Sequence, residues 1–399
     1  MSDRDDHALR TEARIDLPAI RDNVSVLAER AGASRAGVMA VVKADGYGHG
    51  LVPSARAALA GGAGWLGVAT IDEALALRAA GIDQPVLAWL NAPSDRWADA
   101  IGAGVDVSAN ATWAIEEIAA AADRAVPPSP GNDPLRSPRS AAPARVHLKV
   151  DTGLGRGGAA RHDWPELVDA ALKAEASGQL KVVGLWSHLA YADEPGHPTI
   201  ARQVAAFREA VALAENRGVR PEVRHLANSA ATLTLPEAHF DLVRPGIAVY
   251  GITPVPQQGP PSAFGLRPAM TLAARVILTK RVSAGHGVSY GHQYTTATET
   301  TLALVPLGYA DGVPRAATNT GPVLLGGKRR RIAGRVCMDQ FVVDVGDDAV
   351  AAGEEAILFG PGDAGEPTAE DWARTLDTIA YEIVTRIGPR VPRVYLGTI

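Results

Sequence analysis

The hydrophobic positions of this chain form short apolar runs that alternate with longer, alanine-rich stretches of helical spacing. Between residues 14 and 252, eight of these runs read as strands, since they are rich in Val and Leu and mostly apolar throughout. We predict strands at residues 38–43, 65–69, 85–90, 105–108, 146–150, 182–188, 223–227 and 242–250. The regular alternation favours an α/β fold, a TIM-like (β/α)8 barrel over residues 14–253, with a doubly wound open sheet as the alternative.

The pattern changes after this region. Residues 270–359 are rich in Thr and Val, are broken by Gly and Asp-Gly turns, and contain alternating runs such as 340–345. They predict a mostly β C-terminal domain over residues 263–399. Near its end we expect helices at 369–376 and 378–387 and a strand at 393–396. A helix is also predicted at 71–80, with Thr70 as its N-cap and Gly81 closing it.

Three segments show neither the helical nor the strand periodicity of hydrophobic residues. Residues 1–13 are dense in charge and read as a disordered leader. Residues 123–143 are rich in Pro, Ser and Ala and predict a solvent-exposed insertion in the barrel, to which we assign no chemistry. Residues 254–262 follow the last barrel strand and read as a joint between the two domains.

Composition limits the classes of function. The chain has 399 residues, 47% hydrophobic and 21% charged, which suits a globular protein of two domains. Its net charge of −5 gives no reason to expect nucleic acid or a membrane surface as a partner. A single cysteine, Cys337, excludes an internal disulfide and suits a reducing compartment. The N-terminus lacks the apolar core of a signal peptide, so we expect a cytoplasmic protein.

The strongest chemical signal is Lys43, which ends the apolar run 38–43. A primary amine at the carboxyl end of a buried strand loses solvation, so its pKa falls and its neutral form can condense with an aldehyde. A snorkelling lysine is the commoner reading of a lone strand-end lysine. The glycine-rich tail 44–50, with Tyr47 and His49 between glycines, argues against that reading because it builds a tight turn beside the amine.

Four further segments of the barrel carry candidate chemistry. Lys149 ends a strand, and the glycine-rich turn after it brings Arg156, a natural partner for a carboxylate or phenolate, towards it. His188 lies at the end of another strand, although a lone histidine is more often a core residue. Ser229 stands beside a helix N-terminus and is either an ordinary N-cap or a phosphate ligand, or both. Residues 242–247 contain Arg244, Gly246 and Ile247 where barrels commonly bind phosphate.

Taken together and in order, these segments resemble the alanine racemase family, and the resemblance covers nearly the whole chain. The segment 38–50 is similar to that family's pyridoxal-phosphate lysine motif, and Ser289-Tyr290-Gly291, 307–312, 336–340 and 380–383 match segments of its C-terminal domain. We find no departure at a catalytic position. The resemblance implies pyridoxal 5′-phosphate as cofactor and assigns no metal ligand.

The resemblance also implies a role for each matched residue. Lys43 and Tyr290 would be the two catalytic bases. The implied cofactor-binding residues are Lys43, Tyr47, Arg156, His188, Asn228, Ser229, Arg244, Gly246, Ile247 and Tyr381. Arg244 would bond the pyridine nitrogen and leave it unprotonated, because arginine keeps its own proton. Arg156, Tyr309 and Met338 would bind substrate, and Lys149 is a candidate for N-carboxylation.

The implied function is interconversion of L-alanine and D-alanine, which supplies D-alanine for peptidoglycan. The implied assembly is a homodimer in which each active site takes residues from both subunits. Two alternatives stay open: a racemase of serine or of several amino acids, and a pyridoxal-phosphate-binding protein without turnover. Tyr290 argues against the second, and Arg244 argues against a decarboxylase on the same plan.

Overall fold

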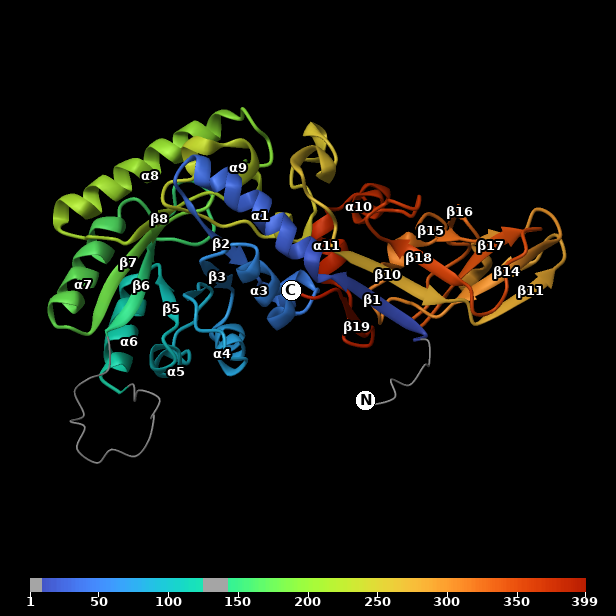
Figure 1. The fold of residues 1–399 in the computed structure, drawn as a ribbon, viewed down its shortest axis with the longest axis horizontal. Helices are drawn as coiled ribbons and strands as arrows, with labels where there is room; N and C mark the ends of the chain where they lie inside the picture. Colours follow the sequence, from blue (N-terminus) through green and yellow to red (C-terminus); the bar gives the residue numbers. More distant parts are fainter. Residues whose placement is uncertain (1–8, 125–142) are drawn as a thin grey trace. The chain divides into compact units, whose positions relative to one another are not determined.

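The computed structural model describes residues 9–124 and 143–399, which divide into two compact units (Figure 1). The barrel unit comprises Ile20–Gly46 and Leu51–Leu266. The β unit comprises the N-terminal segment up to Ala19, the short segment Tyr47–Gly50, and Arg267–Thr398. Each unit has its own sheets and its own buried core.

Eight parallel strands form the barrel unit, in the order β8-β7-β6-β5-β4-β3-β2-β9. Two backbone bonds join the ends of this order and close the ring: the Asp241 N–H donates to the Arg224 carbonyl at 3.0 Å, and the Arg244 N–H donates to Ala227 at 2.8 Å. The strands are β2 (Gly37–Val41), β3 (Trp65–Val68), β4 (Val86–Ala88), β5 (Asp106–Ala109), β6 (Ala144–Lys149), β7 (Leu180–Trp186), β8 (Val223–His225) and β9 (Leu242–Val243). The predicted barrel is confirmed.

Helices connect the strands and lie outside the ring, as α4 to α8 show in Figure 1. They are α1 (Leu17–Ala33), α2 (Lys43–Tyr47), α3 (Leu51–Ala60), α4 (Ile71–Ala79), α5 (Trp97–Gly102), α6 (Thr112–Ala122), α7 (Trp164–Ala176), α8 (Pro198–Arg217) and α9 (Ser229–Thr234), with 3₁₀ turns η1 (Pro236–Ala238), η2 (Ile247–Tyr250), η3 (Pro256–Gln258) and η4 (Pro261–Phe264). Thr70 caps α4 as predicted, and Glu73 completes a capping box. Among the described residues, no helix is long and apolar enough to cross a membrane.

The last barrel strand is shorter than predicted. Residues 242–250 form a continuous apolar run, but only Leu242–Val243 are strand, and Ile247–Tyr250 form the 3₁₀ turn η2. Pro245 has no N–H to donate to a neighbouring strand, and Gly246 lets the chain turn. The residues after them are apolar because all four residues of η2 are buried.

The barrel interior combines an apolar cluster with a polar one. Met39, Leu87 and Leu242 are buried together. Beside them, the ring of His147 lies inside the barrel because its neighbour on β7 is a glycine: a Cβ atom at Gly184 would lie only 2.0 Å from His147 Nδ1. Branched apolar side chains usually fill such an interior. This barrel therefore gives up apolar packing to hold a histidine.

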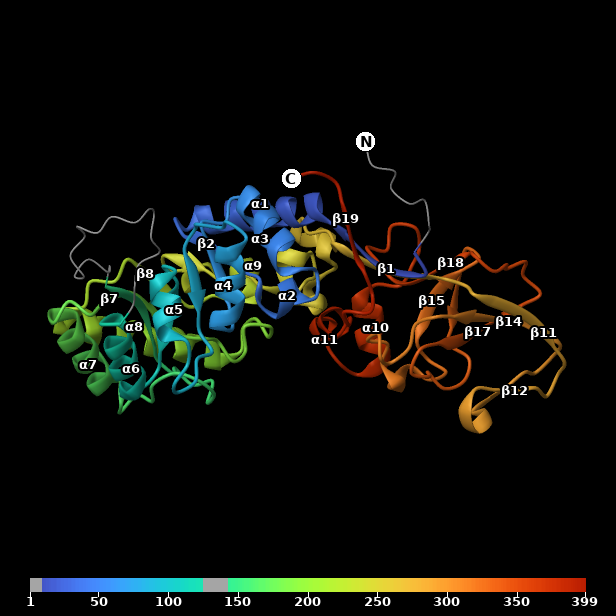
Figure 2. The same ribbon diagram turned by 90° about the horizontal axis from the view of Figure 1, so that it is seen from below.

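The β unit contains a six-stranded sheet in the order β16-β15-β18-β10-β1-β19, a three-stranded sheet β11-β14-β17, and the pair β12-β13 (Figure 2). The strands are β1 (Thr11–Asp16), β10 (Met270–Arg275), β11 (Leu278–Val282), β12 (Gly287–Val288), β13 (Tyr294–Thr295), β14 (Thr300–Val305), β15 (Pro322–Leu325), β16 (Lys328–Arg331), β17 (Phe341–Gly346), β18 (Glu355–Phe359) and β19 (Arg393–Leu396). The other elements are η5 (Tyr290–His292), η6 (Arg315–Ala317), α10 (Ala369–Leu376) and α11 (Ala380–Thr385). The mostly β C-terminal domain is confirmed.

The predicted disordered leader, residues 1–13, is wrong at its end. Residues 11–13 belong to β1, which pairs with β10 in antiparallel and with β19 in parallel direction. Alternate residues of this strand, Thr11, Ala13 and Ile15, are buried, so the short segment has the period-two pattern of a strand that the charged residues around it obscured. Residues 1–8 and almost all of the predicted insertion 123–143 lie outside the described residues.

Candidate active site

Lys43 follows the carboxyl end of β2 and begins a left-handed turn. The next four residues, Ala44, Asp45, Gly46 and Tyr47, have φ values of 53°, 53°, 61° and 52°. A left-handed conformation costs an L-residue roughly 1–2 kcal/mol. Hydrogen bonds hold the turn, since the Gly46 N–H donates to the Val42 carbonyl at 2.8 Å and the Leu51 N–H donates to Asp45 Oδ1 at 2.8 Å.

Glu73 is a second support of this turn, and the sequence reasoning did not assign it a role there. Its carboxylate accepts from the Ala44 N–H at 2.6 Å and from the Ala69 N–H at 2.8 Å, so it joins the ends of β2 and β3. Burial lowers the pKa of Lys43, the charge of Arg156 lowers it further, and the charge of Glu73 opposes both. The amine is therefore easier to deprotonate than an ordinary lysine.

The end of β6 and the loop after it bring a second lysine, Lys149, and an arginine, Arg156, to the same end of the barrel. The Asp151 carboxylate shapes this loop by accepting from the N–H groups of Gly153, Leu154 and Gly155. Burial, with the charges of Arg244 and Arg156, lowers the pKa of Lys149 to about 8. The Lys149 Nζ atom lies 4.2 Å from the centre of the Trp186 indole, an orientation that favours its charged form.

Arg244 is buried after β9 and is held from several sides. One terminal nitrogen donates to the Ser187 carbonyl at 2.8 Å and to His188 Nδ1 at 3.3 Å, and the other donates to His225 Nδ1 at 3.1 Å. Burial lowers the pKa of Arg244 to about 9, which leaves the guanidinium charged at neutral pH. Burial and the neighbouring charges hold the pKa of His188 well below its ordinary value, so His188 is a neutral ring.

A corner that offers hydrogen-bond donors lies where α9 and η2 begin. The Gly246 N–H donates to Ser229 Oγ at 2.8 Å, and the side chain of Asn228 caps α9 by accepting from the Ala231 N–H at 3.1 Å. The Ser229 hydroxyl still has its own hydrogen to donate. Ile247 is the first residue of η2, so its N–H has no partner within that turn. These two donors suit a phosphate group.

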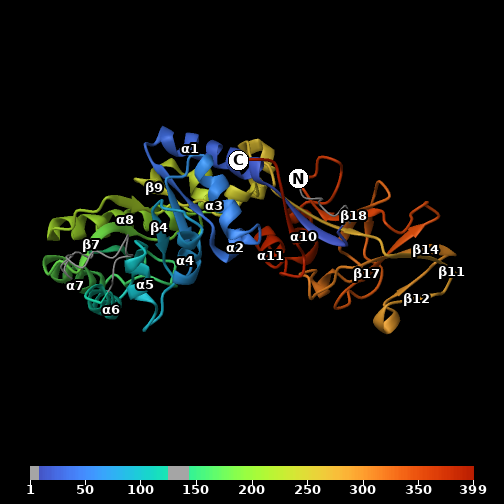
Figure 3. The ribbon, with the colours of Figure 1, turned by 60° about the horizontal axis from the view of Figure 1, so that its bottom comes forward.

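The β unit exposes three predicted site residues: Tyr290 is 72% exposed, Met338 52% and Tyr309 44%. The turn η5, which begins at Tyr290, projects with β12 from the rest of the β unit (Figure 3). The loops that carry Tyr309 and Met338 are hydrogen-bonded to each other. The Tyr309 N–H donates to the Cys337 carbonyl at 3.0 Å, and the Ala310 N–H donates to the Met338 carbonyl at 3.0 Å.

Tyr47 and Tyr381 also lie together in the β unit. Their ring centres are 6.3 Å apart with planes inclined by 49°. Tyr47 is buried, and burial raises the pKa of its hydroxyl, so it is a neutral hydrogen-bonding group. The structure thus gathers the predicted residues into one group in the barrel unit and others in the β unit.

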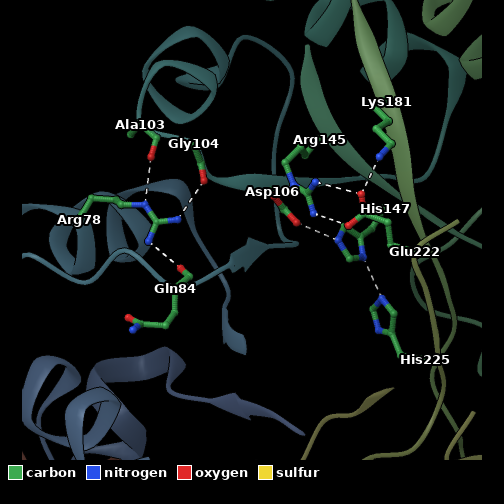
Figure 4. A network of polar contacts seen from close by, with 10 residues as sticks. All are labelled: Arg78, Gln84, Ala103, Gly104, Asp106, Arg145, His147, Lys181, Glu222 and His225. Carbon is green, nitrogen blue, oxygen red and sulfur yellow. Dashed lines mark hydrogen bonds and ion pairs between the residues drawn. The ribbon is translucent and has the colours of Figure 1, made fainter. Parts of the chain in front are cut away.

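A chain of polar groups behind Arg244, buried from His225 to Asp106 and partly exposed at its far end, was missed by the sequence reasoning. It runs from His225 to His147 and on to Asp106, and then to Arg145 and Glu222 (Figure 4). These residues come from three separate segments of the chain, at 106, 145–147 and 222–225, and stand in no common motif. The only available signals were single polar residues, such as His147, inside otherwise apolar strand runs.

The barrel group suits a ligand with several anionic groups and a carbonyl. Lys43, Lys149, Arg156 and Arg244 are basic, and charges among them contribute to the lowered pKa values of Lys43, Lys149 and His188. The corner at Ser229 offers neutral donors. A desolvated amine beside such donors fits an aldehyde that carries a phosphate, which is the chemistry of pyridoxal 5′-phosphate. Within residues 9–124 and 143–399, no group of three or more His, Cys, Asp or Glu side chains is placed to hold a metal ion. Barrel and site together define a pyridoxal-phosphate-dependent enzyme.

Comparison with known proteins narrows this class to one family. The chain matches the family models of the alanine racemase N-terminal domain over residues 15–254 and of the alanine racemase C-terminal domain over residues 269–395. The chain belongs to the alanine racemase family. It is 63% identical to the alanine racemase of Frankia casuarinae over 97% of both chains, and 61% identical to that of Streptomyces coelicolor over 98% of this chain and 97% of that one.

Solved structures agree. The crystal structure of alanine racemase from a D-cycloserine-producing Streptomyces lavendulae matches with a TM-score of 0.93 and 57% identity over 99% of both chains. The alanine racemase of E. faecalis matches with a TM-score of 0.85 and 35% identity over 97% of this chain and 98% of that one. The expected family is therefore confirmed.

We expect Arg156→Gln to raise the pKa of Lys43, because the charge of Arg156 adds to the effect of burial in lowering it. The measurement is the rate at which an acylating reagent labels Lys43 in the cofactor-free protein across a pH series, followed by mass spectrometry. Arg161→Gln is the matched control, because Arg161 lies five residues after Arg156, is exposed and is paired with Glu209. Equal effects of the two substitutions would refute the electrostatic assignment.

Proposed function

We infer that this chain interconverts L-alanine and D-alanine with pyridoxal 5′-phosphate and so supplies D-alanine for peptidoglycan. The observation that carries the inference is Lys43, a strand-end amine with a lowered pKa among anion-binding groups, in a chain of the alanine racemase family. When bound, the cofactor draws electrons from the substrate's α-carbon and makes its proton exchangeable. The chain's own residues bind both ligands and move that proton.

Racemisation needs a base on each face of the α-carbon. We assign one face to Lys43 and the other to Tyr290. The lowered pKa of Lys43 supports this role, since only a neutral amine accepts a proton. A phenol has a pKa of about 10, so Tyr290 needs positive charge nearby to act as a base, and Arg156 is exposed after β6 as a source of it.

The remaining barrel residues orient the cofactor. Arg244 would donate to the pyridine nitrogen and keep its own proton, which leaves that nitrogen unprotonated and disfavours transamination and decarboxylation. The neutral ring of His188 would stack on the pyridine. Asn228, Ser229, Gly246 and Ile247 would hold the phosphate together with Tyr47 and Tyr381, since these positions offer hydroxyl and backbone donors.

Arg156, Tyr309 and Met338 would receive the substrate carboxylate and line its entrance. Lys149 would act through Arg156 after N-carboxylation: its neutral nitrogen attacks carbon dioxide, forms an N–C bond and releases a proton. The lowered pKa of Lys149, about 8, supports this step because it increases the neutral fraction. The resulting carbamate is an anion that pairs with a guanidinium.

We propose a homodimer in which each active site combines the barrel of one subunit with Tyr290, Tyr309 and Met338 of its partner. The exposure of these three side chains supports it, since large apolar groups that stand in solvent on one chain are suited to burial against another. We also place the enzyme in the cytoplasm, where Cys337 remains a thiol.

The central test concerns Lys43. The purified enzyme with cofactor should interconvert the two alanine enantiomers, and borohydride reduction should attach the cofactor's mass to the peptide that contains Lys43. We expect Lys43→Ala to slow both directions by roughly 10³-fold or more, because it removes a base. The assay measures each enantiomer by chiral chromatography. Label on a different lysine, or serine turned over faster than alanine, would overturn the assignment.

Carboxylation of Lys149 should be visible by ¹³C NMR after incubation with ¹³C-bicarbonate. We expect a carbamate signal that weakens as the pH falls below about 8, because the amine becomes protonated and cannot attack carbon dioxide. Lys149→Met should abolish the signal, whereas Lys181→Met should keep it, since Lys181 is an exposed partner of Glu222. Survival of the signal in Lys149→Met would exclude this site.

Shared active sites can be tested with hybrid dimers purified by two different tags. A hybrid of Lys43→Ala and Tyr290→Phe chains should have about half of the wild-type activity, because one of its two sites combines intact residues from both chains.

The reciprocal hybrid is the control. It pairs a wild-type chain with a chain carrying both substitutions, and it should be inactive because each of its sites then contains one defect. If both bases came from the same chain, the two results would be exchanged.

A further inference from the structure

A row of hydrogen bonds crosses the interior of the barrel and ends on Arg244. Asp106 opens β5, and His225 closes β8, so the row connects the amino end of one strand with the carboxyl end of another. A terminal nitrogen of Arg244 lies 3.1 Å from His225 Nδ1. Figure 4 shows the rest of the row, in which His225 Nε2 lies 2.9 Å from His147 Nδ1 and His147 Nε2 lies 3.2 Å from Asp106 Oδ2. All of these groups are buried.

The chemistry of the two ends fixes every hydrogen between them. Arginine only donates, so His225 Nδ1 must accept and the hydrogen of this neutral ring is on Nε2. His147 must then accept at Nδ1 and carry its own hydrogen on Nε2. That hydrogen points at Asp106, which as a carboxylate only accepts. All the bonds therefore run in one direction, from Arg244 to Asp106.

The rings have little freedom to turn out of this row. The indole of Trp186 stacks on His225 with centres 5.6 Å apart and planes inclined by 10°, and Trp65 meets His147 edge-on at 5.5 Å. Gly184 leaves the space that His147 occupies. At the far end, the Arg145 Nε–H donates to Asp106 Oδ1 at 2.8 Å, so the two carboxylate oxygens have separate partners.

We propose that Asp106 is a positioning residue for the reaction: through His147 and His225 it selects the histidine tautomers that let His225 accept a hydrogen bond from Arg244. Asp106 lies at the amino end of β5, whereas Lys43 and Arg244 follow the carboxyl ends of their strands. It acts over two imidazoles, much as a carboxylate fixes the tautomer of a single catalytic histidine. The effect on catalysis rests on the role proposed above for Arg244, whereas the tautomers themselves can be measured without that role.

Asp106→Asn tests the proposal with almost no change in shape. Arg145 still donates at Oδ1, so the amide must keep its oxygen there and turn its NH₂ towards His147. The hydrogen of His147 must then move to Nδ1 and that of His225 to Nδ1, where it opposes the N–H of Arg244. We expect kcat to fall roughly 10- to 100-fold, as for other outer partners of functional groups, with a smaller change in KM.

A second substitution should rescue the first. In Asp106→Asn with Arg145→Met, nothing holds the amide oxygen at Arg145's position, so the amide can rotate, accept from His147 and restore the original tautomers. The double variant should therefore be faster than Asp106→Asn alone. Glu222 keeps its bond to Lys181 at 2.7 Å in this variant. Glu366→Gln is the matched control, a buried carboxylate of the β unit that accepts from Gly362 and Ala364 N–H groups, and it should leave kcat unchanged.

The direct readout is ¹⁵N NMR of histidine-labelled holoenzyme, with the two signals assigned by their loss in His147→Leu and His225→Leu. We expect both rings to be neutral with hydrogen on Nε2 in the wild type, on Nδ1 in Asp106→Asn, and on Nε2 again in the double variant. Hydrogen on Nδ1 in the wild type, unchanged tautomers in Asp106→Asn, or a double variant no faster than the single one would overturn the proposal. Reversed tautomers in a protein that does not racemise alanine would refute the proposed function and leave the tautomer selection standing.

Discussion

A positive charge enclosed in the barrel determines the character of the whole site. Arg244 is surrounded by two backbone carbonyls, two imidazole nitrogens and the face of Trp186, whose ring centre lies 4.9 Å from the guanidinium carbon. Such a charge makes every further positive charge nearby less favourable. Burial lowers the pKa of Lys149 and of His188, and the charge of Arg244 lowers both further, so that neutral forms of both become accessible. The neutral nitrogens in this barrel thus result from burial together with crowding among cations.

The turn after β2 shows how the chain maintains such an arrangement against local preference. Three residues without glycine's freedom, Ala44, Asp45 and Tyr47, adopt the left-handed conformation beside Gly46. Strain of this kind persists where the surroundings over-determine it. Glu73 helps to hold the turn in this conformation, since it completes the capping box of α4 and also accepts from the Ala44 N–H. One carboxylate therefore caps a helix and holds the turn that carries Lys43 in place.

Much of the fold followed from the sequence because its signals are local. Apolar runs bounded by glycine located the barrel strands, and the helix at 369–376 and the strand at 393–396 have the predicted bounds. The candidate residues could be named because each stands in a contiguous motif. Asp106 and His147 could not be named in this way, since their role depends on hydrogen-bond partners that only the closed barrel brings near them. The end of the last strand was also misread, because burial makes a 3₁₀ turn as apolar as a strand.

The strand β1 affects the order in which the β unit can be assembled. It is synthesised before the barrel, yet the strands it pairs with are β10 (Met270–Arg275) and β19 (Arg393–Leu396), which follow the barrel in the chain. Pairings over such distances along the chain form slowly, because the intervening chain must first be ordered. On the ribosome the segments of the barrel emerge before those partners exist. β1 is therefore made before the barrel, but it can take its place in the β unit only after the barrel segments have emerged.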